Sequence, residues 1–248
     1  RSTVATYCGA LDDVRRAYAR TDSAKAAGLK MGDFSYNTGS LRCATCDGTG
    51  QISLDVQFLP DVDIACPDCR GSRYDTAAEK IRRPEKGAPD DQALSLPHLL
   101  ALSVDEALPH VADVKKAHEK LQTLHDLGLG YLTLGEATPA LSGGEAQRLK
   151  LASEMGRGQA DAVFVFDKPT IGLHPRDVET LLDVFQRLVE QGATVVVVEH
   201  DLDFIANVDY VIDMGPQGGK AGGRIVACCT PEEISANRES ITGRYLGI

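Results

Sequence analysis

Long apolar runs and amphipathic stretches alternate in the second half of the chain. Residues 161–167 (DAVFVFD) and 193–200 (ATVVVVEH) are near-continuous apolar runs with polar residues at their ends, which is the pattern of strands buried on both faces. Residues 176–192 lie between them and predict a helix that ends at Gly192. One stripe of this helix carries the apolar side chains Val178, Leu181, Leu182, Phe185, Leu188 and Val189.

The same alternation continues toward the C-terminus. Residues 201–208 (DLDFIANV) predict a short helix, and residues 210–215 (YVIDMG) predict a third strand. Strand–helix–strand order at this spacing predicts a parallel sheet with right-handed crossovers. Ligands bind beyond the carboxyl ends of the strands in such sheets. Asp167 and His200 stand at two of those ends and are therefore candidate site residues.

Residues 141–155 (LSGGEAQRLKLASEM) predict a helix whose first turn can bind phosphate. Ser142 and Glu145 form the pattern of a capping box, and Gly143 and Gly144 leave the first amides uncovered. This helix leads directly into the strand that ends in Asp167. The capping pattern therefore indicates a nucleotide site as well as a helix start.

Four of the seven cysteines form two CxxC pairs with the spacing C-x2-C-x19-C-x2-C. They are Cys43, Cys46, Cys66 and Cys69. Four thiolates at this spacing can close a tetrahedral Zn²⁺ site, and four protein ligands make that site structural. Glycines after each pair let the backbone turn its amides toward the sulfurs. The alternative is four buried thiols without a metal.

The first pair also resembles the cysteine repeats of a class of heat-shock chaperones. Those proteins carry four repeats, whereas here only the first pair fits the repeat in full, so this interpretation ranks low. Cys8, Cys228 and Cys229 lack a matching pair, and we expect them to be free thiols in or near the core.

Composition and charge narrow the class of protein. With 248 residues, 43% of them hydrophobic, the chain can bury the core of one or two domains. No apolar run approaches the ~20 residues of a membrane helix, and the first residues lack a signal-peptide pattern, so we expect a cytoplasmic protein without membrane contact. A net charge of −10 argues against a general nucleic-acid coat but leaves room for a local basic patch.

Several of these motifs resemble known families. LSGGEAQ, FVFDKPTIGLHP and VVVVEH resemble, in this order, the signature motif, the Walker B strand with its loop and the switch-histidine strand of ABC-type ATPases. The cysteine module is similar to the C-terminal zinc module of the UvrA family, the A subunits of bacterial excinucleases. Further UvrA-like stretches are FSYN (34–37), LGLGYLTLG (127–135) and VIDMGPQGGKAGGRIV (211–226).

The resemblance implies the second nucleotide-binding half of such a protein, with an α/β fold. We expect an ABC-type parallel sheet core with a helical insertion that carries a four-cysteine zinc module. The expected domains are 1–41 (helical part of the signature and insertion domain), 42–75 (zinc module), 76–135 (remainder of the insertion domain) and 136–248 (C-terminal part of the nucleotide-binding domain).

The resemblance also implies roles in a composite ATP site with Mg²⁺, shared between two nucleotide-binding halves. Ser142, Gly143 and Gly144 would touch the γ-phosphate of ATP held by the opposite half, with Glu145 and Gln147 in the same motif. Asp167 would hold the magnesium ion through water. His200 would sense the γ-phosphate and its loss as ADP forms; the alternative is a strand-end histidine bonded locally.

Lys168 departs from the family pattern, which has a glutamate at this position to polarise the attacking water. A charged lysine cannot accept that proton. General-base assistance contributes about 10²–10⁴-fold in rate, so we expect slow or absent hydrolysis at this site. The lysine could instead hold the γ-phosphate and favour a closed, ATP-loaded state. A degenerate site, an engineered change and a sequence error are the plainer explanations.

The sequence contains no G-x-x-x-x-G-K-[ST] phosphate loop. The nearest stretch, GPQGGKAGG (215–223), has an alanine after the lysine and is expected to be a turn between strands. In the family the phosphate loop precedes a segment that resembles residues 1–7. The chain therefore resembles a fragment that begins after that loop.

By resemblance, the partners would be double-stranded damaged DNA, a second copy of the protein, the other nucleotide-binding half and a UvrB-like protein, whose docking region would be absent here. Two groups of basic residues are either phosphate contacts or solvated faces. They are Arg15, Arg16, Arg20, Lys25 and Lys30, and then Lys80, Arg82, Arg83 and Lys86. The alternative functions are a UvrA-like drug-resistance ATPase and a non-hydrolysing, ATP-dependent scaffold.

Overall fold

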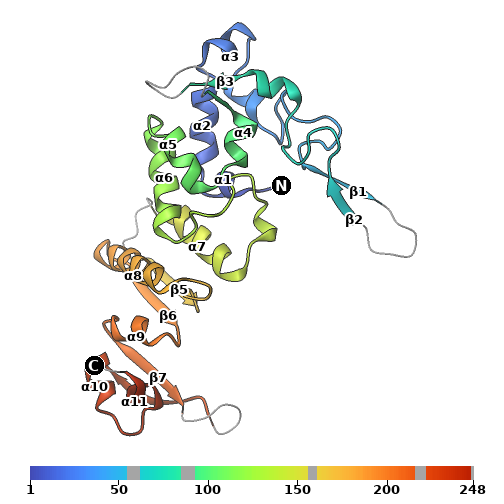
Figure 1. The fold of residues 1–248 in the computed structure, drawn as a ribbon. Helices are drawn as coiled ribbons and strands as arrows, with labels where there is room; N and C mark the ends of the chain where they lie inside the picture. Colours follow the sequence, from blue (N-terminus) through green and yellow to red (C-terminus); the bar gives the residue numbers. More distant parts are fainter. Residues whose placement is uncertain (55–61, 85–92, 156–160, 216–221, 247–248) are drawn as a thin grey trace. The chain divides into compact units, whose positions relative to one another are not determined.

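The structure, a computed structural model, describes residues 1–54, 62–84, 93–155, 161–215 and 222–246. The chain divides into two compact units, residues 1–156 and 157–248, which are described separately below (Figure 1). Among the described residues, no helix combines the length and the apolar character that crossing a membrane requires.

The first unit is mainly helical and carries short antiparallel strand pairs. Its elements are, in chain order, α1 (Val4–Tyr7), α2 (Ala10–Tyr18), α3 (Asp22–Ala26), the 3-10 helix η1 (Met31–Phe34), β1 (Gln51–Leu54), β2 (Val62–Ala65), the 3-10 helix η2 (Thr76–Lys80), β3 (Arg82–Arg83), β4 (Leu94–Ser95), α4 (Leu96–Ala101), α5 (Val104–His110), α6 (Lys115–Asp126), the 3-10 helix η4 (Thr138–Ala140) and α7 (Gly143–Glu154).

Amphipathic helices make the core of this unit. Helix α2 buries Leu11, Val14 and Tyr18, which lie three or four positions apart and so share one face. This face packs against α6. The phenol of Tyr18 is buried, but it donates a hydrogen bond of 3.0 Å to the Leu94 carbonyl, so its burial leaves no unsatisfied polar group.

A charged cluster joins the same two helices. Lys120 donates from Nζ to Asp13 at 2.8 Å, and Arg16 contacts the other carboxylate oxygen of Asp13 at 2.8 Å. Burial alone would favour the neutral acid, yet these two cations outweigh it and lower the pKa of Asp13. The ion pair between Lys120 of α6 and Asp13 of α2 therefore stabilises the packing of the two helices while Asp13 is ionised.

Residues 130–136 form a segment of turns that caps two helices with its carbonyl groups. Glu136 and Leu134 accept hydrogen bonds from the first-turn amides of α1, and Leu132 and Gly130 accept them from the first-turn amides of α5, all at 2.9–3.0 Å. The first amides of a helix lack partners within the helix, and here the segment 130–136 supplies them. The stretch LGLGYLTLG therefore has a structural use.

The second unit contains the predicted strand–helix–strand arrangement. Its elements are β5 (Val163–Asp167), α8 (Pro175–Glu190), β6 (Thr194–Val198), α9 (Leu202–Ala206), β7 (Val211–Gly215), β8 (Arg224–Cys229), α10 (Pro231–Ser235) and α11 (Ile241–Tyr245). Strands β5 and β6 pair in parallel, with α8 as the connection between them, as the sequence predicts. Phe166 of β5 packs on Phe185 of α8 with ring centroids 4.7 Å apart.

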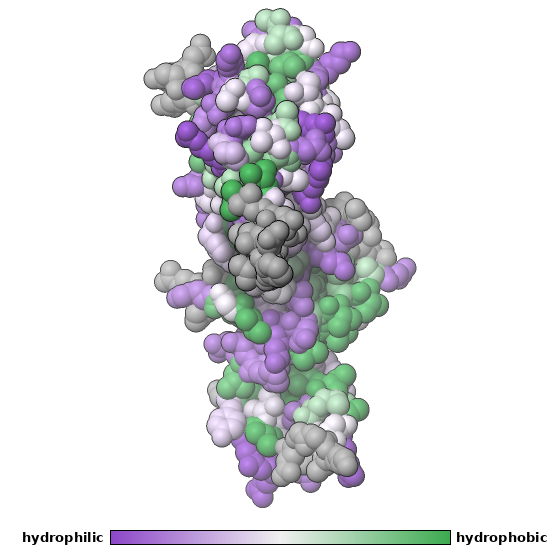
Figure 2. Space-filling model, turned by 90° about the vertical axis from the view of Figure 1, so that its right-hand side faces the viewer, coloured by the Kyte–Doolittle hydropathy of each residue, from purple (hydrophilic) through white to green (hydrophobic). Residues whose placement is uncertain are grey.

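The prediction that these strands are buried on both faces is wrong for this chain. Phe166 faces α8 and is 6% exposed, but Val163 and Val165 on the other face are 65% and 70% exposed. In the register, Val165 stands opposite Val196, which is 46% exposed. We call the exposed apolar side chains Val163, Val165, Val196 and Val198 the valine face. Figure 2 shows hydrophobic residues gathered on the surface of the second unit.

The third predicted strand forms, but it does not join the parallel pair. Strand β7 pairs with β8, and the pairing is antiparallel, so β5–β6 and β7–β8 are separate two-stranded sheets among the described residues. The predicted turn at 215–223 falls between β7 and β8; its residues 216–221 lie outside the described residues. The helix stripe is largely confirmed, with Val189 exposed and Val184 fully buried in its place.

Candidate metal centre and nucleotide-binding elements

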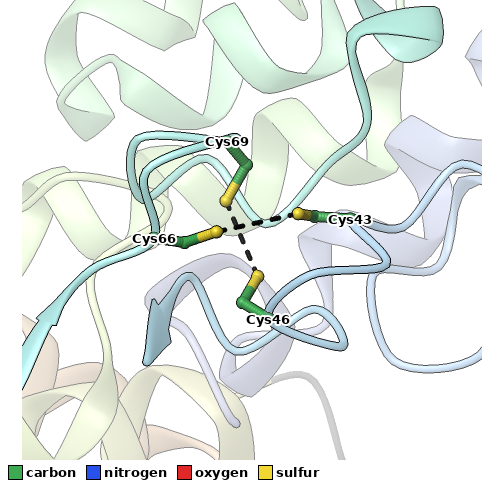
Figure 3. Close-up of side chains that lie close together, drawn as sticks. All are labelled: Cys43, Cys46, Cys66 and Cys69. Atoms are coloured by element: carbon green, nitrogen blue, oxygen red, sulfur yellow. Dashed lines mark hydrogen bonds between the residues drawn. The ribbon is translucent and has the colours of Figure 1, made fainter. Parts of the chain in front are cut away.

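The four paired cysteines of the first unit converge on one point. Their sulfurs all lie within 4.8 Å of one another, and all four residues are buried. The Sγ atoms of Cys43 and Cys66 are 3.8 Å apart, and those of Cys46 and Cys69 are 3.6 Å apart (Figure 3). Four sulfurs at about 2.3 Å from a Zn²⁺ ion in a tetrahedron stand about 3.8 Å from one another. The donor set and its spacing are therefore compatible with zinc.

Each CxxC pair lies in a tight turn. Left-handed backbone follows both pairs, at Asp47 and Gly48 after the first and at Arg70 and Gly71 after the second. A side chain at Gly48 would meet the carbonyl oxygen of Tyr36 at 1.7 Å, so only glycine fits there. The two turns have related geometry, which brings two cysteines from each to the shared centre.

Backbone amides face the sulfurs, as the glycines predict. The amide of Gly50 donates to Sγ of Cys46 at 3.3 Å. Burial opposes ionisation of Cys46, but the Gly50 amide and the thiols of Cys69 and Cys43 outweigh it and lower its pKa to about 7. Burial raises the pKa of Cys69 to about 12. One thiol of the centre is therefore ready to ionise, and a metal would have to displace the proton of another.

The remaining cysteines differ in burial. Cys8 is buried, as expected for a core thiol, and burial raises its pKa to about 11. Cys228 on β8 is exposed and Cys229 is half-buried, so the expectation of a core position fails for Cys228. The alternation of β8 places these neighbours on opposite faces of the strand.

Helix α7 begins as the capping-box pattern predicts. The hydroxyl of Ser142 accepts from the Glu145 amide at 3.4 Å, and Glu145 accepts from the Ser142 amide at 2.6 Å. Gly143 and Gly144 form the first turn, and a side chain at Gly143 would meet no atom within 4 Å, which shows open space there. The buried side-chain oxygen of Gln147 has no hydrogen-bond partner among the described residues.

Tyr131 supports this turn and was not predicted from the sequence. Its hydroxyl donates to Glu145 at 2.5 Å, on the carboxylate oxygen that does not hold Ser142. Leu132 and Leu134 of the segment 130–136 are buried, whereas Tyr131 is exposed and its hydroxyl reaches α7. The hint in the sequence was an aromatic residue between buried leucines.

In the second unit, Asp167 and His200 lie at one edge of the β5–β6 pair. Asp167 is in register with Val198, and the amide of Lys168 donates to the Val198 carbonyl at 2.8 Å. Both strands therefore end together, and Asp167, Lys168 and His200 are all exposed at this edge. Lys168 has a left-handed backbone with φ of 51°, which bends the chain away from the strand.

Glu199 also belongs to this edge and was not predicted from the sequence. One carboxylate oxygen accepts from the amide of Thr170 at 2.9 Å and from its hydroxyl at 2.5 Å. The other accepts from the amides of His200 at 2.8 Å and Asp201 at 3.3 Å. Partial burial favours the neutral acid, but these hydrogen bonds outweigh it and lower the pKa of Glu199.

Several of the predicted basic residues have acidic partners. Arg15 pairs with Asp12 at 2.8 Å, and Lys25 with Asp22 at 3.2 Å, each one helical turn away. Arg83 pairs with Asp113. These ion pairs reduce the local positive potential and favour a solvated face over phosphate contact at these positions. Lys86 lies outside the described residues.

Nearly the whole chain is similar in sequence to the A proteins of bacterial UvrABC systems. It is 47% identical over 247 residues to the UvrABC system protein A of Bacillus subtilis and 46% identical over 247 residues to that of Staphylococcus aureus. Each match covers 99% of this chain and 25% of the relative, so the chain spans about a quarter of the length of these curated relatives.

A solved structure gives the same answer for the fold. The crystal structure of UvrA2 from Deinococcus radiodurans matches 99% of this chain and 29% of its own, with a TM-score of 0.85 and 42% identity. No family model matches the sequence.

Proposed function

We propose, from the premise that this chain is a portion of a UvrA-family ABC ATPase, that it supplies the signature, Walker B and switch-histidine elements of composite ATP sites. The observation that carries the proposal is the common edge of β5 and β6. There the parallel register brings Asp167 and His200 to the ends of neighbouring strands, exposed to a ligand. This edge is where α/β sheets bind their ligands.

Each unit carries its own elements of the proposed composite ATP sites. In the first, Ser142, Gly143 and Gly144 present an uncovered helix start that would bind the γ-phosphate of ATP held by the opposite half. In the second, Asp167 would hold Mg²⁺ through water, and His200 would contact the γ-phosphate. Glu145 keeps the signature turn in shape, and Gln147 lies further along the same helix.

The valine face supports the view that a further part of the nucleotide-binding domain packs on the β5–β6 pair and covers these side chains. Exposed apolar patches of this kind mark surfaces that another element or protein covers. In the proposed complete ATPase, the part of the nucleotide-binding domain that carries the phosphate loop would lie there.

The cysteine centre would hold a structural Zn²⁺ ion. Cys43, Cys46, Cys66 and Cys69 would all be ligands, so no position is left for a reacting water. In the complete protein we propose that this module serves recognition of double-stranded damaged DNA by a dimer that acts with a UvrB-like partner. The names of the relatives, as A proteins of the UvrABC system, support this part of the proposal.

Lys168 favours a second candidate function, that of an ATP-dependent scaffold. Its side chain is exposed at the edge where the family has a general base. We expect Lys168→Glu in the complete protein to raise ATP turnover by about 10²–10⁴-fold. Equal turnover of the two forms would refute this role for position 168.

Three further measurements separate the candidates. Damage-selective binding to double-stranded DNA by the complete protein would support repair, and equal affinity for damaged and undamaged DNA would count against it. ATP-dependent dimerisation without phosphate release would support the scaffold. A deletion strain with normal ultraviolet survival and lost drug tolerance would support the drug-resistance alternative.

A further inference from the structure

Glu199 joins the two loops that follow β5 and β6. Its Oε1 atom holds Thr170, three residues after Asp167, through the amide and the hydroxyl. Its Oε2 atom holds the amides of His200 and Asp201. One carboxylate therefore accepts two hydrogen bonds from each loop, and its half-buried position limits competition from water.

We propose that Glu199 is a positioning residue that couples the loop after Asp167 to the backbone of His200, so that a displacement of one loop displaces the other. The inference rests on the proposed function, because the coupling has a use only if His200 responds to a ligand. In that case the gain or loss of a phosphate at His200 reaches Lys168, Pro169 and Thr170 through this side chain.

A carboxylate suits this position better than any neutral side chain. Both of its oxygens are acceptors, so it can serve donors on two sides at once, and its charge strengthens all of the bonds. A glutamine has one acceptor oxygen, and its NH₂ group would face either the Thr170 amide or the amides of His200 and Asp201. The arrangement therefore requires glutamate, and the Thr170 hydroxyl reinforces one side.

Amide hydrogen exchange, followed by NMR in the ¹⁵N-labelled chain, tests the coupling. In Glu199→Gln we expect exchange at Thr170, or at His200 and Asp201, to become at least about tenfold faster, because one side loses its acceptor. The matched control is Glu190→Gln, at the exposed end of α8, which should leave all three amides unchanged.

The decisive variant is Thr170→Val, which removes one hydroxyl and leaves every acceptor of the His200 and Asp201 amides in place. Coupling predicts that exchange at these two amides nevertheless rises several-fold, and that Thr170→Ser, which keeps a hydroxyl, restores the wild-type rates. Unchanged exchange at His200 and Asp201 in Thr170→Val would overturn the proposal. Amides of the β5–β6 ladder report whether each variant is folded, and if Glu199→Gln unfolds, Thr170→Val decides.

This experiment uses no nucleotide, so it separates the two proposals. If the loops are coupled but the complete protein does not bind ATP, the proposed function is rejected and the role of Glu199 stands. ATP-dependent behaviour with uncoupled loops would reject the role of Glu199 alone.

Discussion

Replacing Cys46 by alanine should weaken zinc binding and unfold the cysteine module while the surrounding helices stay intact. The cluster of four cysteines has a small apolar surround: among the described residues, Ile52 is the partly buried hydrophobic side chain that packs against it. Without a metal, two turns rich in left-handed residues would have to fold on four buried thiols. The metal is therefore expected to supply most of the stabilisation of this module.

The size of the effect follows from the number of ligands. Structural zinc contributes about 10–16 kcal/mol in small zinc domains, so each of four ligands accounts for roughly 2.5–4 kcal/mol. Loss of one ligand should then lower the affinity by about 10²–10³-fold. Metal content by mass spectrometry and competition with a chromophoric chelator measure both the stoichiometry and the affinity.

The matched control is Cys228→Ala, because Cys228 is an exposed cysteine far from the centre in sequence. It should retain one zinc per chain with wild-type resistance to the chelator. NMR amide signals of residues 43–50 and 66–72 should collapse in Cys46→Ala, and those of α2 and α6 should remain. A Cys46→Ala chain that keeps stoichiometric zinc with unchanged affinity would refute the four-ligand centre.

Three further predictions concern stability. Ser142→Ala should cost about 1 kcal/mol through loss of the helix cap, against much less for Ser153→Ala, a partly exposed serine near the other end of the same helix, as urea denaturation will show. Phe166→Ala should cost about 3–5 kcal/mol, but Val165→Ala, on the exposed face of the same strand, less than about 0.5 kcal/mol; equal costs would contradict the assignment of faces. Folding lowers the pKa of Asp13, so its ion pairs stabilise the protein fully above the usual pKa of 3.8, and this stabilisation is lost as the pH falls through the lower pKa of the folded state. The loss of unfolding free energy in Asp13→Asn, measured by urea denaturation, should therefore shrink as the pH falls below 3.8. A loss that stays constant with pH would count against the ion pairs.

Local patterns in the sequence were enough to predict several elements of the fold. The CxxC spacing placed four thiols around one centre, and the S-x-x-E pattern placed the start of α7, because both depend on residues close in sequence. The alternation of apolar runs and amphipathic helix likewise predicted the parallel pair β5–β6 with its α8 crossover.

Hydrogen-bond partners that lie on segments far apart in the sequence could not be predicted. Tyr131 meets Glu145 across 14 positions, and Thr170 meets Glu199 across 29, and neither pair has a spacing pattern. Continuous apolar runs predicted burial on both faces, but hydrophobicity records what a strand can bury and not what covers it in this chain. The sequence also predicted strands on both sides of the turn at 215–223, but it could not show that, among the described residues, β7 and β8 form a sheet separate from β5–β6.

The valine face has a practical consequence for work with the isolated chain. A strip of exposed β-branched side chains on a two-stranded sheet is adhesive in water, and two copies brought close will shield it from solvent. Light scattering that grows as the sample is concentrated would report non-specific self-association through this face rather than a physiological assembly. Lysine at Val165 and Val196 is a direct way to obtain a well-behaved sample without disturbing the aromatic core beneath.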